Sequence, residues 1–96
     1  MKIRGVVHRG LRRFTQRNDP SGLAPAVVEK VRNILTFLQE MEDAQELRDM
    51  PSWKAHQLTG DRKGIWRITV TRNGRITFII DPTESEILDL DYEDYH

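Results

Sequence analysis

The stretch Trp66–Ile80, which reads WRITVTRNGRITFII, decides the fold class of this 96-residue chain. Apolar and polar residues alternate on both sides of Asn73-Gly74, and such a dipeptide between alternating runs is the strongest short signal of a β-hairpin. A two-residue loop at Asn73-Gly74 would mix apolar and polar groups on both faces. A three-residue loop over Arg72–Gly74, with Gly74 left-handed in a bulge, gives one apolar face, so we predict that register. The predicted pairs are Val70 with Ile76, Ile68 with Phe78, and Trp66 with Ile80.

The polar face of this hairpin suggests a contact with phosphate. Arginines and threonines alternate with the apolar residues and would share the face that the core does not use. A basic face that also carries hydroxyl groups is a plausible bed for a phosphate. Its residues are Arg67, Thr69, Arg75 and Thr77.

Two amphipathic segments precede the hairpin and predict helices. Leu11 and Phe14 share one face of a helix expected over His8–Arg17, and Asn18–Gly22 is dense in turn residues. A second helix is expected from Pro25 to about Met41, because proline suits a first turn and an apolar stripe follows it. The stripe consists of Val27, Val31, Ile34, Leu35 and Leu38.

The remaining segments complete an α+β fold. We expect a short strand over Lys2–Val7, a short helical turn or loop over Asp43–Asp49, and a last strand over Ile87–Tyr92. The order is roughly β-α-α-β-β-β, with two helices packed on one face of a small antiparallel sheet and the other face open. A chain of this length predicts one domain, residues 1–96. The last strand is expected to place Leu88, Leu90 and Tyr92 on one side.

Charge is segregated along a chain whose formal net charge is zero. Residues 1–35 carry a net charge of +6, residues 36–53 carry −4, residues 54–80 carry +5 and residues 81–96 carry −7. The zero total argues against bulk electrostatic binding to nucleic acid, whereas the pattern suggests local basic surface and an acidic edge at the end. An acidic tail that only neutralises neighbouring basic strands is an equally good interpretation.

Composition excludes several kinds of site and argues for a location. The chain has no cysteine, which excludes disulfides, thiolate metal sites and cysteine nucleophiles. Its three histidines are scattered, so we expect no metal and no cofactor. No apolar run approaches the roughly 20 residues needed to cross a bilayer, and the start lacks a signal peptide. We therefore expect a cytoplasmic protein without membrane contact.

The residues that carry chemistry permit metal-free cleavage of RNA. This reaction needs a base for the 2′-hydroxyl proton, a cation for the charge on phosphorus and an acid for the leaving 5′ oxygen. His56, Gly60–Gly64, Arg75 and Asp91–His96 contain such groups. The same residues also fit a purely structural interpretation, with a surface histidine, a solvated arginine beside a turn and a frayed tail.

Motifs along essentially the whole chain match one family in order and spacing. They are His8-x-Gly10-Leu11, Ser21-Gly22-Leu23-x-Pro25, His56-x-Leu58-x-Gly60-Asp61-Arg62-x-Gly64, Trp66-x-Ile68-x-Val70, Arg75-Ile76-Thr77-Phe78 and Tyr92-Glu93-Asp94-Tyr95-His96. With them the chain resembles HigB toxins, a branch of the RelE/ParE superfamily of bacterial type II toxin–antitoxin systems. The terminal pentapeptide is specific in combination with Gly-Asp-Arg and Arg-Ile-Thr-Phe.

This resemblance implies a RelE-like fold and a ribosome-dependent mRNA endonuclease that acts by 2′-hydroxyl attack without a metal. It places the active-site positions of the family on His56, Arg75, Asp94, Tyr95 and His96. His56 or His96 would handle protons, and Asp94 would orient a neighbouring group. Tyr95 would stack on RNA or hydrogen-bond to it, and Arg75 would stabilise the charged transition state. Further RNA contacts are expected from Lys54, Arg62, Lys63 and Arg67.

Two positions depart from the family pattern. Many members have lysine, one of the catalytic cations, where this chain has Thr59. Lys54, Arg62 or Lys63 could compensate for that charge. Members also commonly have tryptophan where this chain has Gly74, which fits the left-handed turn expected there but removes an aromatic ring. Weakened toxicity or an altered codon preference is therefore an open alternative.

The resemblance also implies partners. A small HigA-like helix-turn-helix antitoxin would neutralise the toxin and repress the operon, so that operator DNA is bound only through the antitoxin. Basic surface would serve the 70S ribosome and translated mRNA. In the acidic ending, Asp94 would serve the chemistry while the other carboxylates anchor local arginines. The alternatives are a ParE-like gyrase inhibitor and a noncatalytic binding protein with the same fold.

Overall fold

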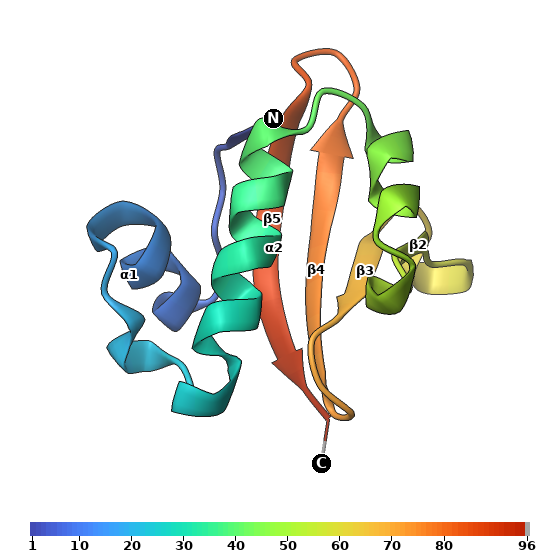
Figure 1. The fold of residues 1–96 in the computed structure, drawn as a ribbon. Coiled ribbons are helices and arrows are strands. Elements are labelled where there is room, and N and C mark those ends of the chain that lie inside the picture. Colours follow the sequence, from blue (N-terminus) through green and yellow to red (C-terminus); the bar gives the residue numbers. More distant parts are fainter. Residues whose placement is uncertain (96) are drawn as a thin grey trace.

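The computed structural model describes residues 1–95, and they form a helical layer packed on a five-stranded sheet (Figure 1). The helices are α1 (Arg9–Arg17) and α2 (Val28–Glu40). The strands are β1 (Lys2–Ile3), β2 (His56–Gln57), β3 (Trp66–Thr69), β4 (Gly74–Asp81) and β5 (Glu86–Asp94). Short 3-10 turns η1 to η5 cover Pro20–Gly22, Pro25–Val27, Ala44–Asp49, Pro51–Trp53 and Gly60–Arg62.

The sheet confirms the α+β class and corrects its pairing. Its strand order is β1-β5-β4-β3-β2, with β1 parallel to β5 and every other pair antiparallel. The sheet is therefore mixed, because the two helices between β1 and the later strands carry the chain back to the end where β1 began. The edge strand β2 is too short for an alternating pattern, so it was not predicted as a separate strand.

The core lies between α2 and the inner face of the sheet. Figure 1 shows α2 lying across β5 and β4, with α1 beside the β1 edge. The apolar stripe of α2 packs on alternate residues of β3, β4 and β5, which is the burial that the two periodicities predicted. Fully buried core residues include Leu11, Val31, Ile34, Leu38, Ile68, Ile76, Phe78, Ile87 and Leu90.

Local signals explain where the helices begin and end. His8 caps α1, because its Nδ1 accepts a hydrogen bond from the backbone N–H of Leu11 at 3.1 Å. Asn18 ends α1 in the left-handed conformation, with φ of 53°. The second helix begins three residues later than its proline indicates, since Pro25–Val27 forms the 3-10 turn η2.

The β3–β4 hairpin keeps the predicted apolar face but not the predicted register. Ile68 lies opposite Ile76 and Trp66 opposite Phe78, a shift of two residues from the expected pairs. A shift by two leaves every side chain on its expected face, which is why the alternation alone could not detect it. The loop is Thr71–Asn73, closed by a hydrogen bond of 2.9 Å from the N–H of Val70 to the carbonyl oxygen of Gly74.

Gly74 is therefore not the left-handed loop residue that we expected. It is the first residue of β4 and is buried, and the glycines with positive φ are Gly60 and Gly64. A Cβ on Gly74 would collide with the hydroxyl oxygen of Tyr92 and would lie 2.9 Å from Oγ1 of Thr71. A glycine is required there because the Tyr92 ring crosses it, not because the backbone turns.

Strand β5 contains a bulge that changes which residues face the core. The register changes between Thr77 opposite Asp91 and Ile79 opposite Leu88, and Asp89 has a φ of 53°. One extra residue in β5 brings Ile87 as well as Leu90 to the inner face, both fully buried. The expectation that Leu88 shares the inner side with Leu90 is wrong for this reason.

Candidate active site at the end of strand β5

The last residues of β5 return beside the start of β4. Glu93 lies opposite Arg75 and Asp94 opposite Gly74, and the N–H of Tyr95 donates a hydrogen bond of 2.7 Å to the carbonyl oxygen of Asn73. Figure 1 shows this C-terminal end beside the β3–β4 hairpin loop. The ladder thus continues to the last described residue and holds the chain end against the hairpin. His96, the remaining predicted site residue, lies outside the described residues.

Arg75 places a cation at this end of the sheet. Its Nη1 donates to three carbonyl oxygens of the hairpin loop and its flank, those of Thr71 at 2.7 Å, Gly74 at 2.9 Å and Arg72 at 3.1 Å. The guanidinium carbon lies 6.0 Å from the centroid of the Tyr95 ring, within the range of a cation–π contact. The loop thus preorganises this guanidinium beside an aromatic ring.

Glu93 links Tyr95 to Arg62, which lies between β2 and β3. It accepts hydrogen bonds from Nη2 of Arg62 at 2.5 Å and from Nη1 at 3.2 Å, and the Tyr95 hydroxyl donates to its Oε1. Burial raises the pKa of Glu93, but the hydrogen bonds from Arg62 and Tyr95 outweigh it and leave the pKa below its usual value. The hydrogen bonds to Glu93 and to Tyr95 raise the pKa of Arg62.

Asp94 points to the opposite face of the strand from Glu93 and Tyr95. It lines a hollow of about 210 Å³ on the helical side, together with His8, Tyr92 and residues of 22–27. The ring centroids of His8 and Tyr92 are 5.7 Å apart. Burial and then the nearby Asp94 raise the pKa of Tyr92, against a smaller opposite effect of a hydrogen bond with Thr71. The two carboxylates at the strand end therefore serve different faces.

His56 lies on the outer face of the sheet but away from the strand end. In β2 it stands opposite Arg67, which stands opposite Thr77 in β4. Arg75 precedes Thr77 by two residues, so the side chains of His56 and Arg75 lie on the same face of the sheet. At about 4.8 Å between strands and 3.3 Å along them, the Cα atoms of His56 and Arg75 are roughly 12 Å apart. Its Nδ1 lies 2.8 Å from the carbonyl oxygen of Lys54, and it lines a separate hollow beside η3.

The outer face is not the open basic bed that the hairpin pattern suggested. Thr77 is only 3% exposed, and a hollow of about 380 Å³ above it is also lined by Arg62, Asp91 and Glu93. Arg62 precedes β3 and binds Glu93 of β5, and it lines the same hollow as Thr77 of the intervening strand β4. Because β5 contributes carboxylates to this face, the phosphate-bed hypothesis is wrong for the part above Thr77.

Three other predicted RNA contacts have different surroundings. Lys54 and Lys63 are exposed, and Lys54 ends η4 in the left-handed conformation. Arg67 is half-buried, and its Nε has no hydrogen-bond partner among residues 1–95. Thr59 is exposed directly before the turn η5.

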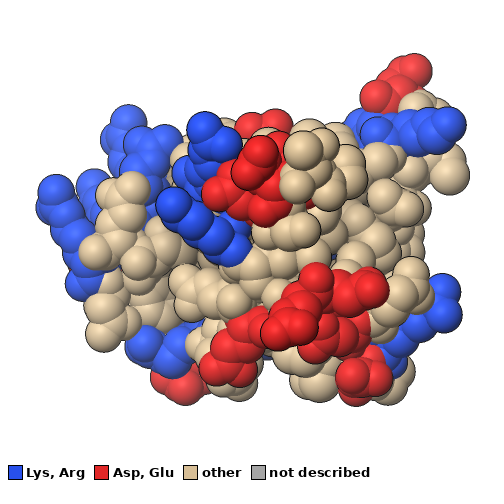
Figure 2. Space-filling view, turned by 90° about the horizontal axis from the view of Figure 1, so that it is seen from above, with Lys and Arg blue, Asp and Glu red and all other residues tan. Residues whose placement is uncertain are grey.

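The surface charge separates the two ends of the molecule. Figure 2 looks down on the end that carries the β4–β5 turn, and acidic side chains spread across it while basic ones gather at the α1 side. Two carboxylates of β5 bind arginines, Glu86 with Arg4 at 3.1 Å and Glu93 with Arg62, as expected for the acidic ending. The candidate site lies at the opposite end from this acidic surface.

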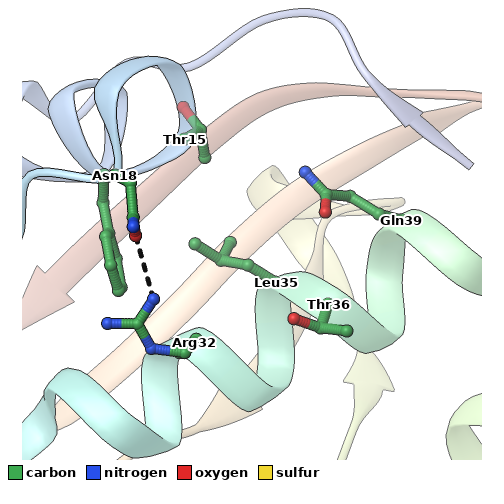
Figure 3. Close-up of a pocket in the computed structure, with 7 residues that line it drawn as sticks. Thr15, Asn18, Arg32, Leu35, Thr36 and Gln39 are labelled. Carbon is green, nitrogen blue, oxygen red and sulfur yellow. Dashed lines mark hydrogen bonds between the residues drawn. The ribbon is translucent and has the colours of Figure 1, made fainter.

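A further hollow of about 210 Å³ lies between α1 and α2 and contains none of the predicted site residues (Figure 3). Arg32 closes it, with its guanidinium 4.8 Å above the Phe14 ring and a hydrogen bond of 2.9 Å to Oδ1 of Asn18. Arg32 also lies 3.7 Å from Glu29. Part of the basic charge of residues 1–35 therefore joins the two helices.

Two general features belong to the described residues 1–95. No group of three or more histidine, aspartate or glutamate side chains in them is arranged to hold a metal ion. None of their helices has the length and hydropathy to cross a membrane.

Glu93 belonged to the candidate segment Asp91–His96 but was assigned no place in the site, and His8 was not expected at the strand end. Glu93 precedes Tyr95 by two residues, so the period of a strand would have placed both on one face had β5 been extended past Tyr92. His8 appeared in the sequence only as part of a motif near the N-terminus. No local pattern indicates that it packs on Tyr92, which lies near the other end of the chain.

Comparison with solved structures agrees with the architecture. A YoeB/ParE toxin from Agrobacterium tumefaciens superimposes with a TM-score of 0.59 at 19% sequence identity, covering 100% of this chain and 99% of that one. This likeness shows that the two chains share one fold, with helices on one face of a five-stranded mixed sheet.

The sequence comparisons give the family. Residues 5–96 match the HigB-like toxins, described as RelE-like toxins of the type II toxin–antitoxin system HigB. The chain is also 35% identical over 94 residues to the endoribonuclease HigB of Proteus vulgaris, covering 98% of this chain and 99% of that protein. The chain belongs to the HigB-like toxin family, and a toxin of this type has an antitoxin as its partner.

Proposed function

We propose that this toxin is an endoribonuclease that cuts mRNA on the ribosome through attack of a ribose 2′-hydroxyl on the adjacent phosphodiester. Endoribonuclease activity is supported by the family and by the full-length relative of that name. The structural observation that favours this chemistry is the return of the β5 end beside Arg75, which sets a fixed guanidinium next to an aromatic ring.

The residues at the strand end fit the demands of that reaction. Attack by the 2′ oxygen places additional negative charge on the phosphoryl oxygens, which a preorganised guanidinium stabilises. We assign this role to Arg75. Within residues 1–95 its hydrogen bonds all come from Nη1, which leaves its other nitrogens to bind the phosphate. Tyr95, which is 41% exposed, offers its ring to an unstacked base.

Proton transfer completes the proposed mechanism. A base removes the proton of the 2′-hydroxyl, the bond from phosphorus to the 5′ oxygen breaks, and an acid protonates that oxygen. We assign these roles to His56 and His96, with Asp94 orienting a neighbour. His56 shares the outer face with Arg75, and their Cα atoms are roughly 12 Å apart, so in this proposal the two side chains approach one scissile phosphodiester from opposite sides.

Thr59 stands where many family members have a catalytic lysine, and the structure distinguishes among the cations that could replace its charge. Arg62 is bound through both terminal nitrogens to Glu93 and is therefore a poor substitute. Lys54, which precedes β2, and Lys63, in the β2–β3 connection, are exposed and remain as cations for RNA. Arg67, half-buried on the outer face, is a further RNA contact in this proposal.

The proposed setting is the cytoplasm, where translated mRNA and the 70S ribosome are found. The proposed antitoxin is a HigA-like helix-turn-helix protein, and operator DNA is bound through it alone. The exposed arginines of α1 provide a basic surface that suits ribosomal RNA.

Mapping of mRNA ends after expression of the toxin without antitoxin tests this function. We expect cuts inside codons of translated messages, and we expect Arg75→Ala and His96→Ala to abolish them. An untranslated copy of the same message is the control and should stay intact. Growth arrest with intact mRNA and with DNA damage would contradict the proposal and would indicate a gyrase inhibitor instead.

A further inference from the structure

A connected group of side chains surrounds the phenol of Tyr95. Arg62 binds Glu93 through both terminal nitrogens, Glu93 accepts from the Tyr95 hydroxyl, and the Tyr95 ring lies beside Arg75. Glu93 has no role in the function proposed above, and Arg62 was expected to contact RNA. We propose that Glu93 and, through it, Arg62 are positioning residues that hold the Tyr95 ring against Arg75. This inference rests on the proposed function for its consequence in catalysis.

The first argument is that Tyr95 needs to be held. It follows the last residue of β5 and is 41% exposed, and an exposed aromatic side chain is ordinarily free to change rotamer. One backbone hydrogen bond, from its N–H to Asn73, fixes the main chain but not the ring. The hydrogen bonds of its hydroxyl, to Glu93 and with Arg62, restrain the side chain.

The second argument is that Arg62 orients Glu93. A guanidinium that binds a carboxylate through two nitrogens fixes the plane of that carboxylate, which a lysine or a single contact does not. Oε2 of Glu93 takes the shorter hydrogen bond, and Oε1 is shared between Arg62 and the phenol. The carboxylate is half-buried, with a side-chain exposure of 23%, so water competes less for it.

The third argument concerns the path of Arg62. Arg62 comes from the β2–β3 connection and binds Glu93 of β5, and the hollow above Thr77 of β4 is lined by both Arg62 and Glu93. An arginine that served RNA would keep its terminal nitrogens toward solvent. Both terminal nitrogens of Arg62 instead face Glu93, so its effect on RNA cleavage passes through the carboxylate.

The same strand contains a matched control. Glu86, at the other end of β5, binds Arg4 through one nitrogen at 3.1 Å, and no site residue among residues 1–95 is connected to that pair. Variants of Arg4 and Glu86 therefore remove a pair of the same chemical type without touching the strand end.

The position of the ring can be measured without any activity. The chain has only two tyrosines, so protein labelled with 3-fluorotyrosine gives two fluorine NMR resonances, assigned with Tyr92→Phe and Tyr95→Phe. We expect Glu93→Ala and Arg62→Ala to move the Tyr95 resonance toward that of free fluorotyrosine and to narrow it, while Glu86→Ala leaves it in place. Glu93→Gln, which keeps an acceptor oxygen, should retain part of the shift. An unchanged Tyr95 resonance in Glu93→Ala would overturn the proposal.

The consequence for cleavage is tested by a mutant cycle in single-turnover reactions on ribosome-bound mRNA. We expect Arg62→Ala, Glu93→Ala and Tyr95→Phe each to slow cleavage about tenfold with little change in substrate affinity, and the double variants to be no slower than the single ones. Arg4→Ala and Glu86→Ala should cleave like wild type. Arg62→Ala could instead weaken substrate binding, and its loss of cleavage rate could multiply with that of Glu93→Ala in the double variant. This result would mean that Arg62 contacts RNA itself and that the positioning role is wrong.

The two proposals fail in different ways. A wild-type protein that cuts no ribosome-bound mRNA contradicts the proposed function, and the fluorine resonances still decide whether Glu93 and Arg62 hold the ring. A wild-type protein that cuts mRNA while the losses multiply contradicts the positioning role alone.

Discussion

Strand β5 binds an arginine at each of its ends, and the two pairs differ in what else they contact. At the start of the strand, Glu86 receives one hydrogen bond from Arg4, whose side chain is 62% exposed. At the end, Glu93 receives two hydrogen bonds from Arg62 and a third from Tyr95. The first pair only neutralises charge beside β1, whereas the second belongs to a network that reaches Arg75.

This difference shows how one acidic strand serves a protein that we propose to act on RNA. Its carboxylates are neither a uniform repulsive edge nor a tail that merely balances charge. Glu86 is the first residue of β5, directly after the β4–β5 turn, whereas Glu93 lies near the other end of the strand and is bound by Arg62. The strand can thus carry negative charge while the hairpin end presents Arg75.

Arg75→Ala should have the largest effect on activity. Removing one preorganised donor from a charged transition state costs about 10²–10³ in rate, and we expect a loss of that size in single-turnover cleavage. Arg75→Lys should recover part of the rate, since it keeps the charge but loses the planar fork. The control is Arg4→Ala, which removes the partner of Glu86 at the other end of β5. Equal rates for wild type and Arg75→Ala would contradict the role of this end of the strand.

Gly74→Ala should have the largest effect on stability among single changes at the strand end. Its Cβ would collide with the Tyr92 hydroxyl and lie 3.0 Å from Cζ of that ring, so we expect a loss of about 1–3 kcal/mol. Urea unfolding measures it. Tyr92→Phe removes the colliding oxygen and should make the second substitution less costly. A Gly74→Ala protein as stable as wild type would show that the ring does not cross the glycine.

Glu93→Gln should cost about 0.5–1 kcal/mol of unfolding free energy at neutral pH, and Glu86→Gln about 0.2–0.5 kcal/mol, because both pairs are partly exposed to solvent. The pKa of Glu93 is lowered in the folded state from its usual 4.5, so its contribution is complete above that value and is lost as pH falls through the folded pKa. The gap between wild type and Glu93→Gln should therefore close in acid. A gap that stayed constant between neutral pH and about pH 3 would contradict the ionised pair.

Ionisation of the Tyr92 phenol should have the smallest effect on stability, and this effect should appear at alkaline pH. Its folded pKa is raised above 10.0 by burial and by Asp94, so its stabilising contribution is complete below that pH and is lost as pH rises through the folded pKa. Wild type should lose stability relative to Tyr92→Phe as pH rises from about 9 to about 11. Asp94→Asn should make this loss smaller. No difference between the two proteins across that range would show that the phenol is not sequestered.

Alternation in the sequence predicted the hairpin face because burial acts on every second residue. It could not select between registers that differ by two, since both bury Ile68, Ile76 and Phe78. The choice depends on Tyr92, which occupies the space above Gly74. The bulge at Asp89 was also invisible, because neither glycine nor asparagine marks the left-handed position.

The site was predictable to a different degree in its different parts. The family resemblance named Arg75 and Tyr95, and the structure brings these two together. It also named His56, which lies on the same face but in the edge strand. The ion pair of Arg62 with Glu93 joins residues 31 apart in sequence, and no local pattern connects them. Charge counts predicted that carboxylates bind arginines but could not assign the partners.

The most direct test of the account is whether cleavage inside the codon depends on Arg75. Wild-type toxin and Arg75→Ala are compared on the same ribosome-bound mRNA, with Arg4→Ala as the matched variant at the other end of β5. The account predicts cuts inside the codon for wild type and Arg4→Ala, and a loss of about 10²–10³ in their rate for Arg75→Ala. Cuts of unchanged position and rate in Arg75→Ala would place the chemistry elsewhere and contradict it.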